Sequence, residues 1–226
     1  MRLLVAGTLC AAVFLYGSAA HATVKKRVDC KVDKCVALTF DDGPSVHTGR
    51  LLDLLEKHGA RATFFVTGQN TRGNHRLLRR MVQEGHEIGT HTQNHPDLTR
   101  LSATRVKKEL HGPIPDIEAA GARVTLARPP YGATNAKVRG VMREMGLVQV
   151  LWDVDPQDWL VRDARRVAGR ILKQTGRGEV VLAHDIHKTT VDAMPKVIKA
   201  LQKRGYRLVT VSELRGLVPP LPAPES

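Results

Sequence analysis

The sequence predicts a single α/β domain, built as a distorted (β/α)7 barrel of parallel strands. Three observations support this fold class. Short apolar segments typical of strands alternate with helical patterns along most of the chain. Five of the apolar segments end in a cluster of Asp, His or Arg, as expected where parallel strands assemble one site. The length of 226 residues suits one domain with a substantial core.

Seven segments are predicted to be strands. Each holds four to six residues that are mostly apolar, and each is followed by polar or turn-forming residues. Because helical patterns separate most of them, the strands are expected to pair in parallel. The segments are residues 36–40, 62–66, 87–90, 124–127, 147–152, 179–183 and 206–210.

Helices are predicted between most of these strands. In each, apolar residues recur at spacings of three and four, and a glycine follows the last turn or lies close behind it. The segment 102–121 differs, because Gly112-Pro113-Ile114-Pro115 must break any helix that begins at Ser102. The regular helices are expected at residues 48–57, 75–84, 135–145, 163–174 and 191–204.

The amino-terminal 22 residues have the layout of a secretory signal peptide. Arg2 precedes an apolar stretch, and small residues end at Ala22. A membrane anchor is the alternative, but the stretch is short for a bilayer span. We expect a secreted extracellular protein without stable membrane insertion, whose association with the cell wall is open. The expected organisation is a signal peptide at 1–22, a lead containing Cys30 at 23–34, the α/β domain at 35–214 and a Pro-rich tail at 215–226.

After signal removal two cysteines remain, Cys30 and Cys35. In an exported chain an even count favours a disulfide, although a pair of metal ligands is the alternative. The net charge of +13 becomes +12, because the signal contains one base and no acid. This charge suits a solvated surface or attraction to an anionic cell-wall polymer. Aromatic content of 4% and bases scattered through helices give no indication of nucleic-acid binding. We expect a monomer.

The polar clusters that follow the strands contain side chains that can hold a metal and act as a base and an acid. His91 and His95 are four residues apart, so one turn can direct both imidazoles at one point. Two His and one carboxylate make an open divalent-metal site. Adjacent Asp41 and Asp42 point in different directions on an extended chain, so one can bind metal while the other faces water. A plain turn is the alternative interpretation of Asp-Asp-Gly.

Two further clusters supply charge and an acid. Arg128 opens a proline-rich loop that can hold its guanidinium against a carboxylate, or that is a structural turn. His184 follows the sixth strand and is a candidate general acid. Asp158 can fix its ring and raise its pKa, and Trp159 can form an apolar wall.

Five motifs in this chain resemble, in order, those of the NodB-type polysaccharide deacetylases, carbohydrate esterase family 4. They are TFDDG at 39–43, HTQNH at 91–95, RPPYG at 128–132, DPQDW at 155–159 and VVLAHD at 180–185. The resemblance covers about residues 35–211. It implies a distorted barrel fold. It also implies metal-dependent removal of acetyl groups from polymers of N-acetylglucosamine, such as peptidoglycan or chitin. An O-acetyl xylan esterase and an inactive carbohydrate-binding homologue are the alternatives.

Matched position by position, the resemblance implies a role for each motif residue. The implied metal is zinc, with cobalt or nickel compatible. The implied metal ligands are Asp42, His91 and His95. The implied catalytic residues are Asp41 as base, Arg128 holding the base, His184 as acid, Asp158 tuning the acid, and Tyr131 binding the oxyanion through its backbone N–H. The implied substrate contacts are Trp159 and Leu182, as walls of an acetyl pocket, and Tyr131.

The chain departs from the family pattern in two places. Gln93 stands where many relatives have an aromatic residue, which is expected to alter a wall of the substrate site. The break at 112–115 changes the segment before RPPYG. Five histidines of the expected mature chain are interpreted as surface or turn residues: His47, His58, His75, His86 and His111. His187 lies close to the motif residues in sequence, and no role is assigned to it.

Overall fold

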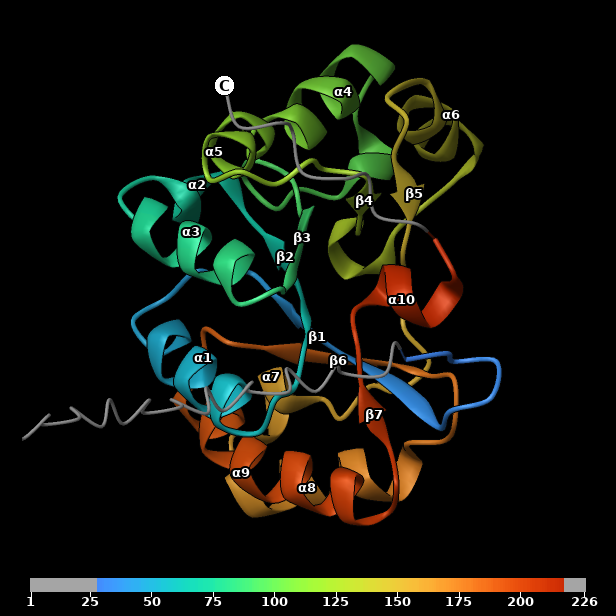
Figure 1. Cartoon of the computed structure of the whole chain (residues 1–226). Helices are drawn as coiled ribbons and strands as arrows, with labels where there is room; N and C mark the ends of the chain where they lie inside the picture. The colour runs from blue at the N-terminus through green and yellow to red at the C-terminus, as the bar shows by residue number, and fades with distance from the viewer. Residues whose placement is uncertain (1–27, 218–226) are drawn as a thin grey trace, which may run out of the picture.

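A computed structural model describes residues 28–217 (Figure 1). All seven predicted strands are present, and every pairing between them is parallel. The sheet runs β5-β4-β3-β2-β1-β6, with β7 paired to β1. The strands are β1 (Cys35–Asp41), β2 (Thr63–Val66), β3 (Glu87–Thr90), β4 (Leu126–Ala127), β5 (Val148–Gln149), β6 (Val180–His184) and β7 (Arg207–Leu208).

The barrel is distorted at two places. Strands β5 and β6 are the ends of the sheet path and do not pair with each other. The segment after β5 meets β6 at an isolated bridge between Val154 and Val181 and through a few hydrogen bonds around it. Strand β7 pairs with only the first two residues of β1, Cys35 and Val36. The predicted distorted barrel of seven strands is therefore confirmed.

The regular helices are confirmed, with ends that differ by up to three residues. The predicted break also occurs: α4 (Ala103–His111) ends before Gly112, and α5 (Ile114–Ala119) begins after Pro113. The confirmed helices are α1 (Thr48–Lys57), α3 (His75–Gln83), α6 (Ala136–Glu144), α8 (Ala164–Gln174) and α9 (Lys188–Lys203). Elements not predicted are α2 (Gly68–Thr71), α7 (Asp158–Val161), α10 (Val211–Arg215), η1 (Leu98–Arg100) and η2 (Pro130–Gly132).

Side-chain caps fix where several helices begin. The side chains of Ser102, Asn135 and Asp163 each accept a hydrogen bond from the backbone N–H three residues later. Each bond satisfies one donor that the first turn of a helix leaves free, which stabilises a helix by about 1 kcal/mol. These caps explain why α4, α6 and α8 start where they do.

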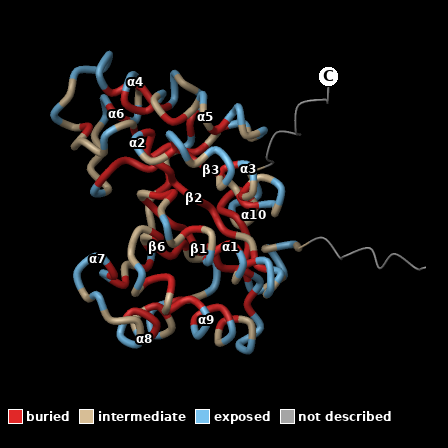
Figure 2. Tube along the Cα trace, turned by 90° about the vertical axis from the view of Figure 1, so that its left-hand side faces the viewer, coloured by how far each residue is buried: buried red, intermediate tan, exposed pale blue. Residues whose placement is uncertain are grey.

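Alternate residues of the strands build two apolar layers. On β1, Leu38 and Phe40 belong to the layer that packs against the helices, whereas Ala37 packs with Phe65 inside the barrel. Successive strand residues point to opposite faces. Asp41 therefore shares the inner face with Ala37 and lies at the carboxyl end of the barrel interior. Figure 2 shows the buried strands at the centre of the fold.

The amino-terminal lead is attached to the domain by the predicted disulfide between Cys30 and Cys35, which the structure confirms. Arg177 adds a hydrogen bond to the carbonyl oxygen of Lys31 at 2.6 Å. The predicted signal peptide at 1–22 and most of the predicted tail at 215–226 lie outside the described residues. Within residues 28–217, no helix has the length and apolar character needed to cross a bilayer.

Candidate active site

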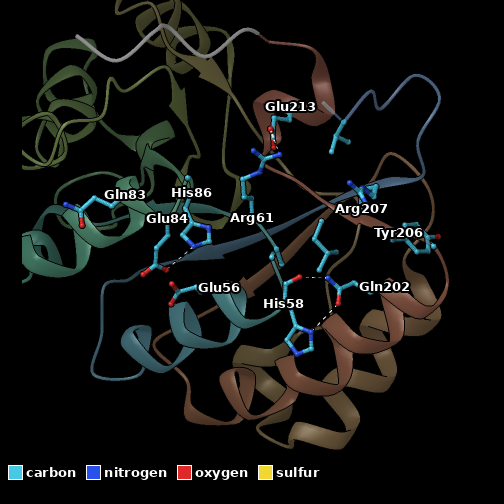
Figure 3. Close-up of a pocket in the computed structure, with 16 residues that line it drawn as sticks. Glu56, His58, Arg61, Gln83, Glu84, His86, Gln202, Tyr206, Arg207 and Glu213 are labelled. Atoms are coloured by element: carbon cyan, nitrogen blue, oxygen red, sulfur yellow. Dashed lines mark hydrogen bonds and ion pairs between the residues drawn. The ribbon is translucent and has the colours of Figure 1, made fainter. Parts of the chain in front are cut away.

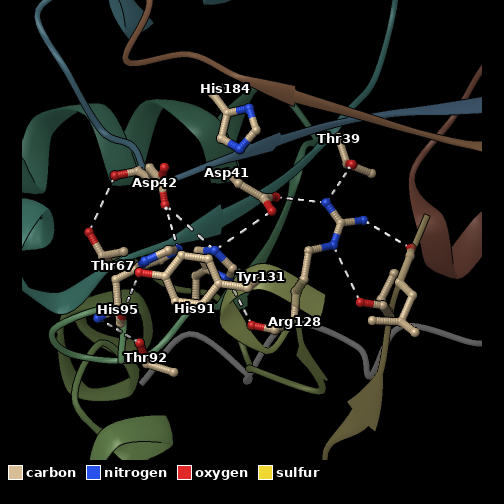
Figure 4. A network of polar contacts seen from close by, with 12 residues as sticks. Thr39, Asp41, Asp42, Thr67, His91, Thr92, His95, Arg128, Tyr131 and His184 are labelled. Carbon is tan, nitrogen blue, oxygen red and sulfur yellow. Dashed lines mark hydrogen bonds and ion pairs between the residues drawn. The ribbon is translucent and has the colours of Figure 1, made fainter. Parts of the chain in front are cut away.

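The carboxyl ends of the central strands bring the predicted clusters together. Asp41, the last residue of β1, is paired in register with His184 of β6. His91 directly follows β3, and Arg128 directly follows β4, which is paired with β3. The side chains around this point in Figure 4 include Asp41, Asp42, His91, His95, Arg128, Tyr131 and His184.

Asp42, His91 and His95 form a candidate metal centre. Their ligand atoms all lie within 4.8 Å of one another. Asp42 Oδ1 is 3.5 Å from His91 Nε2 and 3.4 Å from His95 Nε2, and it is buried without a hydrogen-bond partner. A buried carboxylate oxygen without a partner is costly unless a cation satisfies it. Two imidazoles and a carboxylate suit zinc, so these residues fit the expected metal.

The two imidazoles are prepared to act as ligands. His91 Nδ1 lies 2.7 Å from the carbonyl oxygen of Arg128, so Nδ1 donates the hydrogen and Nε2 keeps its lone pair. The ring of Tyr131 packs edge-on against His95, with ring centres 4.7 Å apart. Burial, together with the charge of His91, lowers the pKa of His95. A lowered pKa favours the neutral imidazole that a metal requires.

The backbone at the metal centre adopts conformations that are rare for residues with side chains. Asp42, Thr92 and His95 have φ values of 73°, 71° and 57°. Each such residue costs on the order of 1–3 kcal/mol and persists only where neighbouring contacts enforce it. Asn70 donates to the carbonyl oxygen of Asp42 at 2.7 Å, and Thr92 Oγ1 accepts from the N–H of His95 at 3.0 Å. These bonds hold the ligands in position.

Asp41 is held by a fully buried arginine. Arg128 Nη1 donates to Asp41 Oδ1 at 2.7 Å and to Thr39 Oγ1 at 2.7 Å. The guanidinium carbon also lies 4.2 Å from the centre of the Phe65 ring. Two backbone carbonyl oxygens, those of Val150 and Leu151, accept from its other nitrogens. With these bonds Arg128 fixes the orientation of the Asp41 carboxylate, as the sequence resemblance implies.

His184 and Asp158 form the second charged pair. His184 Nδ1 lies 2.9 Å from Asp158 Oδ1, and Asp158 Oδ2 accepts from the His184 backbone N–H and from Thr190 Oγ1. Burial acts to lower the pKa of His184. The hydrogen bond and charge of Asp158, with the charges of Asp41 and Asp42, outweigh burial and raise this pKa to about 9. His184 is therefore protonated at neutral pH, as a general acid must be.

The remaining three predicted residues lie around the same site. Tyr131 has φ 60° and a side chain 70% exposed, and no described residue accepts a hydrogen bond from its backbone N–H. Leu182 is buried on β6 two residues before His184, so the two side chains share the inner face. Trp159 lies next to Asp158 in α7 and is 48% exposed.

Comparison with known proteins agrees with this geometry. The family model for polysaccharide deacetylase matches residues 29–150, more than half of the chain. The chain belongs to the polysaccharide deacetylase family. The matched part includes both His ligands, both adjacent aspartates and Arg128, whereas Asp158 and His184 lie beyond it.

Two bacterial members of the polysaccharide deacetylase family are similar to this chain. The chain is 44% identical over 183 residues to the peptidoglycan-N-acetylmuramic acid deacetylase PdaC of Bacillus subtilis, covering 80% of this chain and 38% of that one. It is 40% identical over 188 residues to the peptidoglycan-N-acetylglucosamine deacetylase PgdA of Listeria monocytogenes, covering 82% and 40%. The chain thus spans about two fifths of these curated relatives. A solved structure of B. subtilis PdaC superposes with TM-score 0.79 at 43% identity, covering 84% of this chain and 93% of that structure.

One supporting contact in this deacetylase-family domain was not predicted from the sequence. Asp185 is fully buried and its carboxylate lies against Gly43, where a Cβ atom would come within 2.4 Å of Asp185 Oδ1. Its other oxygen accepts a hydrogen bond from Thr48. The glycine that follows Asp41 and Asp42 is therefore needed for space. The sequence offered no signal, because the two residues are far apart along the chain.

We predict that Gly43→Ala destabilises the fold by about 1–3 kcal/mol, since the added methyl must displace a buried carboxylate. Urea unfolding followed by circular dichroism measures the change. Gly169→Ala is the matched control, because nothing lies within 4 Å of a Cβ added at this position of α8. The control is expected to stabilise the protein by up to about 1 kcal/mol. Equal stabilities of wild type and Gly43→Ala would refute the steric role.

The side chain of Gln93, at a position where many relatives have an aromatic residue, is packed closely against two glycines. A Cβ on Gly68 would lie 2.0 Å from Gln93 Oε1, and one on Gly112 would lie 2.4 Å from the same atom. The side chain therefore fills a narrow space between α2 and the break after α4. Asn70, which donates to the carbonyl oxygen of Asp42, also lines a hollow of about 560 Å³. The other lining residues are Pro44, Ser45, Val46, Gly49, Asn74, Leu77 and Ile186.

A larger cavity of about 1170 Å³ has a different lining, which includes the loops that precede β2 and β3 and both residues of β7 (Figure 3). Among its lining residues, His86 lies in the turn between α3 and β3, and it is buried there rather than at the surface. Its Nδ1 accepts from the N–H of Ala62, and its ring packs edge-on against Phe64. Burial, with the charges of Arg61 and Arg80, lowers its pKa to about 4. His86 is a neutral structural residue.

Proposed function

We propose that the protein is a secreted, metal-dependent polysaccharide N-deacetylase that acts on N-acetylglucosamine polymers, either peptidoglycan or chitin-type chains. One observation carries the proposal: the Asp42–His91–His95 group lies close to the buried Asp41–Arg128 pair and to the largely buried Asp158–His184 pair. A metal centre with a held carboxylate on one side and a cationic imidazole on the other suits amide hydrolysis.

Asp41 acts as the general base. When bound, a divalent cation supplies Lewis-acid polarisation of the acetyl carbonyl and makes water more acidic. Asp41 then accepts a proton from the attacking water through the carboxylate oxygen that Arg128 does not hold. Arg128 holds Oδ1 at 2.7 Å, and the accepting oxygen Oδ2 lies on the side of the candidate metal ligands, 3.7 Å from His91 Nε2. Zinc is the expected cation, and the same donors accept cobalt or nickel.

His184 and Tyr131 complete the reaction. The N–H of Tyr131 donates to the oxygen of the tetrahedral intermediate, which lowers the barrier to its formation. His184 Nε2 then gives its proton to the departing amine nitrogen, while Asp158 holds Nδ1 and stabilises the charged ring. Leu182 and Trp159 enclose the acetyl methyl group. No covalent acyl-enzyme is required.

The panel of substrates that tests the proposal also tests its alternatives. Acetate release is measured after chelation and zinc addition, with peptidoglycan fragments, chitin oligomers and acetylated xylan. Metal-restored release from the first or second supports the N-deacetylase and separates its two substrate classes. Release from xylan alone indicates an O-acetyl esterase instead, and no release indicates an inactive binding homologue.

Export is part of the proposal. The disulfide between Cys30 and Cys35 supports it, because such bonds persist mainly in oxidising compartments outside the cytoplasm. Detection of the mature protein in culture medium or in the cell-wall fraction, beginning near residue 23, tests export and the predicted cleavage after Ala22. A protein retained in the cytoplasm contradicts it.

We predict that activity falls as pH rises through about 9, because His184 then loses the proton that it must donate. In Asp158→Asn the carboxylate that raises this pKa is gone, so the alkaline limb should move to lower pH by roughly one unit or more. The pH profile of kcat measures the alkaline limb of the wild type and of the variant. His187→Ala is the control, since its ring lies beside His184 without holding it, and its limb should not move. An unmoved limb in Asp158→Asn contradicts the assignment.

A further inference from the structure

The positive charge of the domain is concentrated in its last part. Residues 162–217 contain 13 Lys and Arg against five Asp and Glu, whereas residues 28–161 contain 18 against 16. One of those five acids, Asp185, is fully buried. Most of the positive net charge of the described domain thus belongs to residues 162–217, although the bases seemed scattered along the sequence. An excess of one sign in one region creates a local field that attracts ions of the opposite sign.

Helices α8 and α9 contain most of these bases and pack side by side (Figure 1). Arg204 donates to the carbonyl oxygen of Leu172, which joins the ends of the two helices. Six exposed bases on the pair form no ion pair with any described residue, and we call them the α8–α9 basic face. They are Arg165, Arg166, Lys173, Lys196, Lys199 and Lys203.

The basic face extends from the active site. α9 begins four residues after His184, at the same end of the sheet, and its connection to the next parallel strand takes it toward the opposite end. Lys188, which is paired with Asp192, lies at its first turn, and Lys203 of the basic face lies at its last, about 22 Å away along the helix axis. Arg162, exposed beside Trp159, adds a base at the start of α8. A linear polymer that leaves the site can therefore follow the bases.

We propose that the α8–α9 basic face binds the substrate polymer itself, an acetylated glycan strand that carries carboxylates. This rests on the proposed deacetylase function and narrows its substrate class to acidic glycans, of which peptidoglycan is one and chitin is not. Carboxylates on the strand match unpaired Lys and Arg in sign and gain from their field at low ionic strength. A neutral glycan gains nothing from these bases.

Two triple variants test the proposal by location of charge. Lys196, Lys199 and Lys203 on α9 are each replaced by Gln, which keeps helix propensity nearly unchanged. In the control, the exposed bases Arg105, Lys107 and Lys108 of α4 are each replaced by Gln. Both variants lose three charges, so net charge is equal and only position differs. Circular dichroism checks the fold of each.

Binding is measured by co-sedimentation with insoluble peptidoglycan, with the same polymer after its carboxylates are converted to neutral methylamides, and with chitin. The α9 variant is expected to bind untreated peptidoglycan about tenfold more weakly than wild type, and the control within about twofold. Amidation or 0.5 M salt should remove the difference, because the interaction is screened over about 10 Å at 0.1 M.

Equal binding by the α9 variant and wild type would overturn the proposal. So would an equal loss in both variants, unchanged binding after amidation, or tighter binding to a phosphodiester polymer than to the carboxylated glycan. Acetate release from a neutral acetylated oligomer is measured separately on all three proteins and should be equal. If none releases acetate while the binding difference persists, the proposed function fails and the binding surface stands.

Discussion

Asp41→Asn is expected to reduce acetate release by about a thousandfold or more while the metal stays bound. A positioned general base contributes roughly 10²–10⁴ in rate, and an amide cannot accept the proton from water. The metal should remain, because Asp42, His91 and His95 are unchanged and their ligand atoms lie within 4.8 Å of one another. Single-turnover acetate release and zinc content of the purified variant are the measurements.

The same substitution leaves Arg128 without an anionic partner. This guanidinium is fully buried, and breaking a buried pair costs about 3–5 kcal/mol of stability. Urea unfolding must therefore show that the variant is folded under the assay conditions. Asp155→Asn is the matched control, because Asp155 lies in the loop between β5 and α7. Among the described residues, its carboxylate accepts a hydrogen bond only from the N–H of Gln157, so the variant should keep near wild-type activity. Substantial turnover by a folded Asp41→Asn would refute the assigned base.

His91→Ala is expected to weaken zinc binding by about a hundredfold or more and to abolish turnover. It removes one of three protein ligands, and even loss of an outer contact to a ligand costs 10–100-fold in affinity. Its loss also frees the carbonyl oxygen of Arg128, to which Nδ1 donates at 2.7 Å. Equilibrium dialysis with zinc, followed by elemental analysis, gives the stoichiometry and affinity.

His187→Ala provides the comparison for this measurement. His187 lies 5.9 Å from His184 between ring centres and is outside the group of candidate ligands. It should bind one zinc with wild-type affinity. Unchanged zinc affinity in His91→Ala would remove that residue from the ligand set, whereas equal losses in both variants would indicate a general disturbance of the loops.

Much of the fold followed from local patterns in the sequence. All seven strands were predicted because each is a short apolar run between helices with clear spacing of three and four. Strands β4, β5 and β7 are only two residues long, since the barrel distorts where they pair. Helices α2, α7 and α10 were missed because four or five residues are too few to establish a helical period.

The site residues were predictable for a different reason than their supports. Side chains such as His91 directly follow predicted strands, so parallel topology alone places them together. Thr39, which accepts from Arg128, was also accessible to reasoning, since it lies two residues before Asp41 on the same face of β1. The contact of Gly43 with Asp185, and the bond of Thr190 to Asp158, depend on how loops pack. The spacing of apolar residues along the sequence does not predict contacts of this kind.

The isolated bridge between Val154 and Val181 leads us to expect that the proposed catalytic groups differ in their resistance to partial unfolding. Asp158 lies on the segment that this bridge attaches to β6, whereas Asp42 and the ligand histidines follow strands in the interior of the sheet. A local opening of this seam separates the acid from its partner and spares the metal ligands. We therefore expect loss of the proposed activity and loss of a bound cation to be two successive events on partial unfolding.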